Sequence, residues 1–468
     1  MNDVDAGPGV LRANCWTGAD VEGVVGPDAL KWAIVDRDTV PSELLAPKDI
    51  DYDDWTHPDV GWGVVLPERD DLDAHAKSVA ADAPAAIQEL VRRRGGAPVL
   101  RYTPALAARG LLRRYERGGG STEPGPRGDR GTAAGQIPHY LLIVASPAEI
   151  PWNFQYRLQT EAFVGRLDLD AAGLENYVGA LLDDWKRSRR DVGKPVVWSV
   201  DHGHPDMTRL MRRTIADRLA NAFQRDPEFA DPGLYLSDGA ATAGKLVEAI
   251  RRRRPAFIAT TSHGATYPLD DPITLAGQLG ALVDADHSLL GPKNLPTDWE
   301  AEGAIWYAHA CCSAGASRVS AFQGLLSESS TLGRTVQSLG QAGEISATLP
   351  KALLGHARPL GAFIGHVEPT FNWTLYDAGN QETTTSHIVR TLYNLLHASA
   401  RPTVGRALKQ YYGYVASLLL QHHDAIAALQ RHAPGAPDLA IRTKLVATDL
   451  LSMVLLGDPT VRLPHSQT

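Results

Sequence analysis

The chain has 468 residues, of which 44% are hydrophobic and 21% charged, so it exceeds one ordinary domain and can bury a substantial core. The net charge of −8 argues against general nucleic-acid binding, and three cysteines are too few for a disulfide scaffold or a paired zinc site. No apolar run approaches the roughly 20 residues of a membrane span, and MNDVDAGPGV at the start lacks the features of a secretory signal. We therefore expect a cytoplasmic protein that binds neither nucleic acid nor a membrane.

The N-terminal part of the chain gives few signals of organisation. LKWAIV (30–35) is a short apolar run, and residues 71–94 have the alanine-rich periodicity of a helix. We expect residues 1–117 to form an N-terminal region of unknown role. Residues 118–136 are rich in glycine, proline and polar residues, a composition that predicts a flexible linker.

From residue 138 onward, apolar strands alternate with helices. The expected strands are HYLLIVA (139–145), PVVWSV (195–200), GLYLS (233–237), AFIATTS (256–262) and GAIWYAHA (303–310), and the expected helices are 173–188, 208–223 and 242–252. Apolar strands joined by helices predict an α/β fold with a mostly parallel central sheet and helices on both faces. We divide this part into a first α/β subdomain, 137–194, and a second domain, 195–468, which carries the reactive residues.

Two of the expected strands end in reactive residues. His263 and Gly264 follow AFIATTS, and Cys311 follows the strand that ends in AHA. Parallel strands place their carboxyl ends at one edge of a sheet, so we expect His263 and Cys311 to meet there. A cysteine thiol, with a usual pKa of about 8.5, needs a base such as imidazole to become a nucleophile at neutral pH. The N–H groups of Gly264 and Cys311 could then stabilise an oxyanion. From spacing alone, a turn histidine and a core cysteine remain the alternative.

These residues lie in two motifs with a known counterpart. TSHG and HACCSAG resemble the His-Gly and Ala-Cys signatures of caspase-fold cysteine peptidases, and the closest similarity is to the gingipain-like branch. Further similar segments, in the same order along 138–464, are HYLLIVASPAEIP, FVGRLDLDAAGLENYVGALL, GAFIGHVEPTFNW and LLSMVLLGDPTVRLP. The resemblance implies a caspase-like α/β sandwich preceded by an N-terminal extension. It also implies a cysteine endopeptidase that acts on proteins or peptides through a Cys311–His263 dyad and a thioester acyl-enzyme.

The two adjacent cysteines are not equivalent in this comparison. The signature places alanine directly before the nucleophile, which favours Cys311 after Ala310 over Cys312. Cys312 is then expected to be a small buried neighbour. His309 precedes Cys311 by two residues on the same strand, and we interpret it as a packing or positioning residue. Cys15 lies outside the region of resemblance and has no evident role.

The resemblance also suggests which residues recognise the substrate side chain. In arginine-selective members, an aspartate at the start of the helix before the His-Gly strand binds the substrate arginine, and Asp206 occupies the matching position. The alternative for Asp206 is a helix cap, and Asp201 is the second choice for the pocket. Trp373 matches a family tryptophan that lines the same pocket, although it could equally be a core residue. Whether Glu368 supplies another carboxylate stays open.

Four arginines in expected loops predict processing. Arg127 and Arg130 lie in the expected linker, and Arg318 and Arg334 lie in a stretch after the nucleophile. We expect a zymogen that is cut at such sites by itself or by an upstream protease, although most loop arginines are simply solvated. The resemblance further implies a role in bacterial stress or anti-phage defence, triggered by an upstream protease or sensor. No metal site or cofactor is expected, and calcium is left open because some relatives bind it.

Two other functions remain as alternatives. The first is a non-catalytic caspase-fold scaffold or regulatory binding module, against which the presence of His263, Gly264 and Cys311 argues. The second is an unrelated doubly wound nucleotide-binding protein. Neither a Gly-x-Gly-x-x-Gly loop after the first strand nor a Gly-Lys-Ser/Thr loop is present to hold a phosphate.

Overall fold

The computed structural model describes most of the chain. The described residues are 10–27, 29, 32, 50–227, 229, 231, 233–296, 302–397 and 401–464. The apolar run at 30–35 therefore lies outside them, apart from Trp32. No helix within the described ranges is long and apolar enough to cross a membrane.

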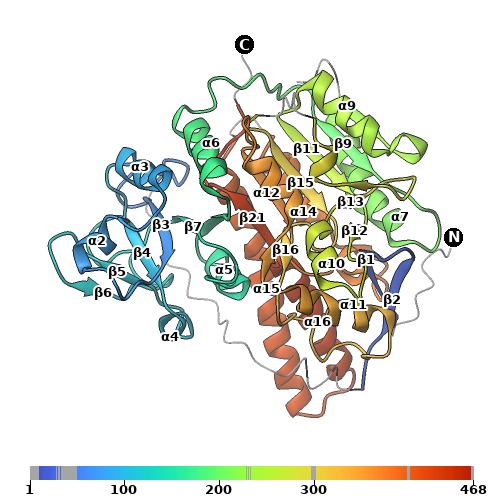
Figure 1. Ribbon diagram of the computed structural model, residues 1–468. Coiled ribbons are helices and arrows are strands. Elements are labelled where there is room, and N and C mark those ends of the chain that lie inside the picture. The colour runs from blue at the N-terminus through green and yellow to red at the C-terminus, as the bar shows by residue number, and fades with distance from the viewer. Residues whose placement is uncertain are drawn as a thin grey trace.

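A central sheet organises the molecule (Figure 1). Its strands are β3 (Trp62–Pro67), β4 (Val99–Tyr102), β5 (Arg113–Tyr115), β6 (Ser121–Thr122), β7 (Tyr140–Val144), β8 (Phe163–Leu167), β9 (Val196–Ser199), β10 (Leu234–Leu236), β11 (Phe257–Thr261), β15 (Ile305–His309), β18 (Ala362–His366) and β21 (Met453–Gly457). The strand order is β10-β9-β11-β15-β18-β21-β8-β7-β3-β4-β5-β6. Neighbours are parallel except for β18–β21, β4–β5 and β5–β6. The expected α/β fold with a mostly parallel sheet is confirmed.

The helices follow from the same alternation. They are α2 (Ala74–Ser78), α3 (Ala85–Arg93), α4 (Pro104–Ala107), α5 (Trp152–Gln159), α6 (Ala171–Leu182), α7 (Met207–Met211), α8 (Asp217–Arg225), α9 (Ala243–Arg253), α10 (Pro272–Gln278), α11 (Thr331–Ala342), α12 (Thr348–Leu354), α13 (Asn372–Leu375), α14 (Ser386–Arg390), α15 (Val404–Gln430) and α16 (Ala436–Leu451). The strands β7, β8, β11, β15 and β18 are buried along their whole length. Burial on both faces explains why these strands are continuous apolar runs in the sequence.

Residues 62–122 extend this sheet and do not form a separate unit. β3 pairs in parallel with β7, with Trp62 opposite Tyr140. The carboxylate of Asp458, after β21, accepts hydrogen bonds from the Trp62 indole at 3.0 Å and from Arg94 at 3.1 Å. β8 likewise pairs with β21. The single sheet thus crosses the divisions expected at residues 117 and 194. Pairing between strands far apart in the sequence leaves no mark in local composition, so the sequence did not show this continuity.

The segment 118–136, expected to be a flexible linker, is held to the sheet edge. It contains β6, and the Arg114 guanidinium donates to the carbonyls of Thr132, Ala133 and Gln136 at 2.7–2.9 Å. The glycines and prolines therefore form tight turns around a buried arginine, a use of these residues that composition cannot distinguish from a linker.

A second, smaller sheet lies near the carboxyl ends of β11 and β15. Its strands are β1 (Val10–Trp16), β2 (Asp20–Val24), β12 (Gly264–Ala265), β13 (Leu282–Val283) and β14 (Leu289–Leu290), in the order β14-β13-β12-β1-β2. Figure 1 shows β1 and β2 beside β12 and α11, on the far side of the molecule from β3 to β6. The N-terminal region is thus divided between two sides of the fold, which the sequence did not indicate.

Candidate active site

Two parallel neighbouring strands position the reactive pair. β11 and β15 pair with Thr261 opposite His309, and His263 and Cys311 each follow two residues later. A Cβ built on Gly264 would lie 1.9 Å from the carbonyl oxygen of Cys311 and 3.0 Å from its nitrogen. Only glycine allows this approach, so the His263–Gly264 segment and Cys311 meet at the sheet edge as the sequence predicts.

Asp206 contacts the imidazole of His263. One carboxylate oxygen of Asp206 lies 2.9 Å from His263 Nε2, and both side chains are almost completely buried. The other oxygen accepts the backbone N–H of Thr208 at 2.6 Å, which caps the start of α7. A carboxylate on one ring nitrogen fixes the orientation and tautomer of the imidazole. Asp206 was expected to bind a substrate arginine, but the structure places it as the partner of His263.

The remaining residues of the expected specificity pocket contact other groups. Asp201 accepts the N–H of Gly203 at 2.8 Å and lies 3.4 Å from Arg212. Trp373 is half-buried on α13, with Arg442 5.7 Å from its ring. Glu368 accepts hydrogen bonds from Ser320 at 2.8 Å and from the Ala321 N–H at 3.0 Å. The structure therefore gives each of these three residues contacts within the fold, and α13, which carries Trp373, packs against α7, which Asp206 caps.

The strand β1 passes through the site in an extended conformation. Ala13 forms an antiparallel bridge with Phe371, and the N–H of Asn14 donates to the carbonyl of Thr370 at 3.1 Å. On the opposite side, Cys15 and Trp16 pair in parallel with Gly264 and Ala265 of β12. β1 is thus held by its backbone between the His263–Gly264 segment and the residues that follow β18.

The carbonyl of Asn14 lies where an oxyanion would be stabilised. The backbone N–H of Cys311 donates to this oxygen at 3.2 Å. Thr266 N–H donates to the carbonyl of Trp16 at 3.1 Å, and in a regular parallel ladder the donors are spaced by two residues. The donor two residues before Thr266 is Gly264, and the acceptor two residues before Trp16 is Asn14. The N–H of Gly264 therefore points at the Asn14 carbonyl as well. The two donors expected from the sequence therefore converge on one peptide carbonyl.

The thiol of Cys311 is covered by β1. The Sγ atoms of Cys15 and Cys311 are 3.1 Å apart, and the N–H of Thr370 donates to the Cys311 sulfur at 3.3 Å. Burial, followed by the contact with Cys15, raises the pKa of the Cys311 thiol well above its usual range. A protonated thiol is a poor nucleophile, so Cys311 is held in an unreactive form while β1 covers it.

The indole of Trp16 anchors β1 above the imidazole. Its ring stacks on His263 and on His202, each at 5.7 Å between centroids, and lies tilted against His287 at 4.3 Å. Burial lowers the pKa of His202 to about 4, so this ring is neutral at physiological pH. Trp16, His202 and His287 were not found from the sequence, because they lie in three segments with no shared motif.

His309, expected to be a packing or positioning residue, is packed inside the sheet edge. Its Nδ1 lies 2.9 Å from the hydroxyl of Tyr307, and its ring meets the edge of His366 at 4.9 Å. Burial lowers the pKa of His309 to about 3, so it is neutral and unsuited to act as the base. Cys312, the expected bystander, is buried with a φ of 55°. Burial raises the pKa of its thiol as well.

The proximity of Cys15 and Cys311 can be tested by oxidation. Glutathione disulfide should be reduced to two glutathione thiols as the Cys15 and Cys311 thiols form one disulfide, since their sulfurs need to approach only from 3.1 Å to about 2 Å. Titration of free thiols should then fall from three to one per chain, and peptide mapping should recover the Cys15–Cys311 link. Cys15→Ser is the control, and its two remaining thiols should stay free under the same treatment. A Cys311–Cys312 link, or none, would contradict the placement of β1.

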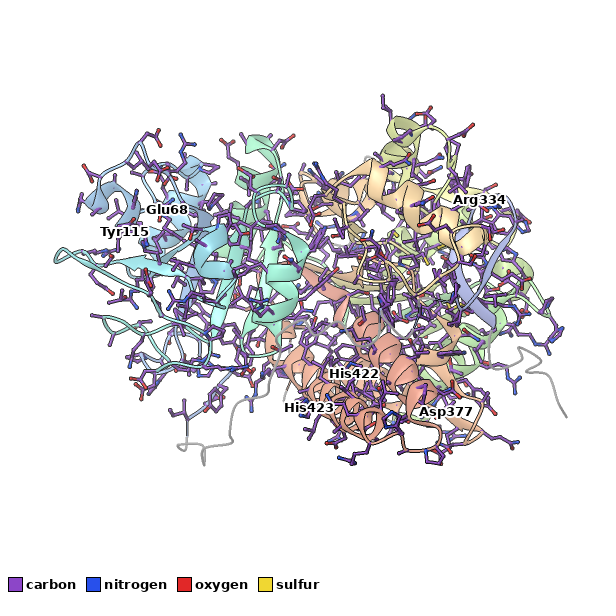
Figure 2. The ribbon with its side chains drawn as sticks, turned by 90° about the horizontal axis from the view of Figure 1, so that it is seen from below. Glu68, Tyr115, Arg334, Asp377, His422 and His423 are labelled. Atoms are coloured by element: carbon purple, nitrogen blue, oxygen red, sulfur yellow. The ribbon has the colours of Figure 1, made fainter. Side chains whose placement is uncertain are left out.

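The four arginines predicted as processing sites differ in accessibility. Arg127 and Arg318 are exposed in loops. Arg130 instead donates to the carbonyls of Pro138 and Glu161, at 3.3 and 2.7 Å. Arg334 is exposed on α11, which Figure 2 shows at the opposite end of the molecule from Glu68 and Tyr115. Because proteases bind extended chain, Arg127 and Arg318 fit a processing site better than Arg130 and Arg334.

Within the described part of the chain, no three or more His, Cys, Asp or Glu side chains are grouped so as to hold a metal ion. No protein-family model matches the chain, and no curated protein matches it.

Proposed function

We propose that the protein is a cysteine endopeptidase of caspase-like α/β architecture. The observation that carries this proposal is the Asn14 carbonyl: an extended strand presents a peptide carbonyl to the backbone N–H of a cysteine that ends a parallel strand. The neighbouring strand supplies His263, oriented by Asp206. Nucleophile, base, orienting carboxylate and oxyanion donors thus lie around one peptide group.

The reaction follows from these positions once a substrate replaces β1. His263 takes the proton of the Cys311 thiol, and the sulfur attacks the substrate carbonyl carbon. The carbonyl oxygen becomes an oxyanion between the N–H groups of Cys311 and Gly264. The C–N bond then breaks as the leaving amine takes the proton from His263, which leaves a thioester on Cys311. Water, deprotonated by His263, hydrolyses the thioester and regenerates the thiol.

The covered thiol extends the proposal to a zymogen. The peptidase is inactive while β1 lies in the cleft, and an upstream protease or sensor of a bacterial stress or anti-phage pathway would release it. The arginine preference suggested by the resemblance loses its main support, because the carboxylate expected to bind arginine contacts His263.

One observation favours a second function. Cys311 is completely buried beneath β1, as it would be in a caspase-fold scaffold that never exposes a nucleophile. The test must therefore displace β1 before activity is measured.

The test uses an opened variant that carries Leu11→Asp and Trp16→Ala. Leu11 is completely buried and Trp16 packs against three imidazoles, so both changes should weaken the seating of β1. We expect this variant to cleave an unfolded protein substrate. Adding Cys311→Ala should abolish turnover, a loss of about 10⁴-fold or more.

Cys312→Ala is the matched control, because it removes a buried thiol one residue away and should retain turnover within about threefold. Absence of turnover from the opened variant, with its fold intact by circular dichroism, would favour the scaffold. Loss of turnover only in Cys312→Ala would reassign the nucleophile.

A further inference from the structure

The direction and register of β1 match those of a bound peptide. Its backbone pairs antiparallel with the residues after β18 and presents the Asn14 carbonyl to the Cys311 N–H. Under the proposed mechanism, Asn14 then stands directly before the position of the scissile bond and Cys15 directly after it. Arg12 and Ala13 occupy the two preceding positions, and the Arg12 N–H donates to the side chain of Asn372 at 3.4 Å.

The surroundings of the Asn14 side chain suit an amide. The side chain is completely buried, and its Nδ2 donates to the carbonyl of His309 at 3.1 Å. An aspartate here would oppose its charge to this carbonyl in a dry environment, which is unfavourable. Two further buried polar atoms, Asn14 Oδ1 and Thr370 Oγ1, lack a hydrogen-bond partner among the residues that the structure describes. The acceptor that the lining offers is thus the His309 carbonyl, and the Nδ2 contact with it is what distinguishes an amide.

A long cationic side chain fits this place poorly. The Asn14 side chain meets the backbone carbonyl of His309, whose ring packs against His366 at 4.9 Å. Asp449, beyond His366, accepts the N–H of Phe371 at 2.9 Å. The Asp449 carboxylate also accepts a hydrogen bond from the Thr374 hydroxyl, so it is held within the fold. Among the described residues, no carboxylate is hydrogen-bonded to the completely buried Asn14 side chain, and a guanidinium in its place would lose its water.

We infer that the cleft selects protein segments with asparagine directly before the scissile bond, and that β1 occupies it as an intramolecular analogue of such a substrate. This inference rests on the proposed peptidase function and names its substrate class. The backbone groups that pair with β1 can bind any extended chain, whereas the His309 carbonyl distinguishes an amide from a carboxylate of the same size.

The test measures how fast peptide probes label Cys311 in the opened variant. Each probe carries Leu-Arg-Ala followed by Asn, Asp or Arg and ends in a thiol-reactive ketone. The asparaginyl probe should label at least about tenfold faster than either of the others, the effect of one buried hydrogen bond. The intact wild type should react slowly with all three, since β1 competes with them.

The outcomes separate the inference from the function on which it rests. Faster labelling by the arginyl or aspartyl probe would overturn the asparagine preference and leave the peptidase standing. Absence of labelling by every probe, together with absence of protein turnover, would overturn both.

A second variant tests the same contact in the otherwise native chain. Asn14→Asp keeps the size of the side chain and places a carboxylate against the His309 carbonyl. It should loosen β1 and speed the alkylation of Cys311 by iodoacetamide about tenfold. Asn176→Asp, the same change at an amide on α6 that donates to the Gly355 carbonyl, away from β1, should have little effect. An unchanged rate for Asn14→Asp would overturn the role of the amide.

Discussion

Replacing Asp206 with asparagine in the opened variant is expected to lower kcat/KM by about 10²- to 10⁴-fold. The carboxylate lies 2.9 Å from His263 Nε2, where it fixes one tautomer and stabilises the imidazolium that forms when Cys311 loses its proton. An asparagine amide can present its N–H₂ to the ring and favour the wrong tautomer. Because asparagine is also a good helix cap, α7 should keep its start and the protein its fold.

The test measures kcat and KM as a function of pH for several peptides, in Asp206→Asn and in the control variant Asp201→Asn. Asp201 lies near the same sheet edge but contacts Arg212, so its change should alter kcat/KM by less than about threefold. The loss in Asp206→Asn should fall mainly on kcat and should be equal for all substrates. A loss confined to the KM of peptides with arginine before the cleaved bond would restore the arginine-binding role instead.

The change Gly264→Ala is expected to reduce turnover by about 10²- to 10³-fold. Its Cβ would lie 1.9 Å from the carbonyl oxygen of Cys311, closer than any atoms can approach, and the obstructing atoms are all backbone. The His263–Gly264 segment must therefore move away from the nucleophile. The Gly264 N–H would then leave the oxyanion, and His263 would leave the thiol.

Gly277→Ala is the control for this change. Gly277 lies in α10 with nothing within 4 Å of a built Cβ, so alanine should be tolerated there and should stabilise the helix by up to about 1 kcal/mol. Turnover and thermal unfolding are measured for both variants in the opened background. Full turnover by Gly264→Ala would mean that the oxyanion is stabilised by other groups.

The strands and the reactive pair could be predicted because their signals are local. β7, β11 and β15 are continuous apolar runs, and His263 and Cys311 directly follow two of them. The parallel arrangement then brings the two ends together without further information. This part of the site needs only the rule that parallel strands share an edge.

The role of Asp206 could not be separated from its alternatives in the same way. Its position at a helix start was recognised, and it does cap α7, but its second oxygen reaches a residue 57 positions away. The sequence contains no sign of that contact. A resemblance to arginine-selective enzymes therefore assigned the carboxylate to the substrate, while the fold places it against the His263 imidazole.

β1 was missed for a different physical reason. LRANC alternates apolar and polar residues, and Leu11, Ala13 and Cys15 are buried, but the run is short. Apart from β2, its partners Thr370 and β12 lie about 250 to 350 residues later in the chain. Backbone pairing does not depend on side-chain pattern and leaves little trace in a sequence. Cys15 consequently looked like an isolated cysteine with no role.

The separation of β1 and β2 from the large sheet has a consequence for how the protein could be switched on. β1 is joined to β12 by two residue pairs and to the segment after β18 by the Ala13–Phe371 bridge, whereas the twelve-strand sheet contains neither β1 nor β2. The hairpin can therefore detach by a local opening that leaves the central sheet folded. Detachment would uncover β12 as an unpaired edge, which an incoming polypeptide completes by strand addition. Hydrogen exchange at β1 and β12 should accordingly be faster than at β11 and β15.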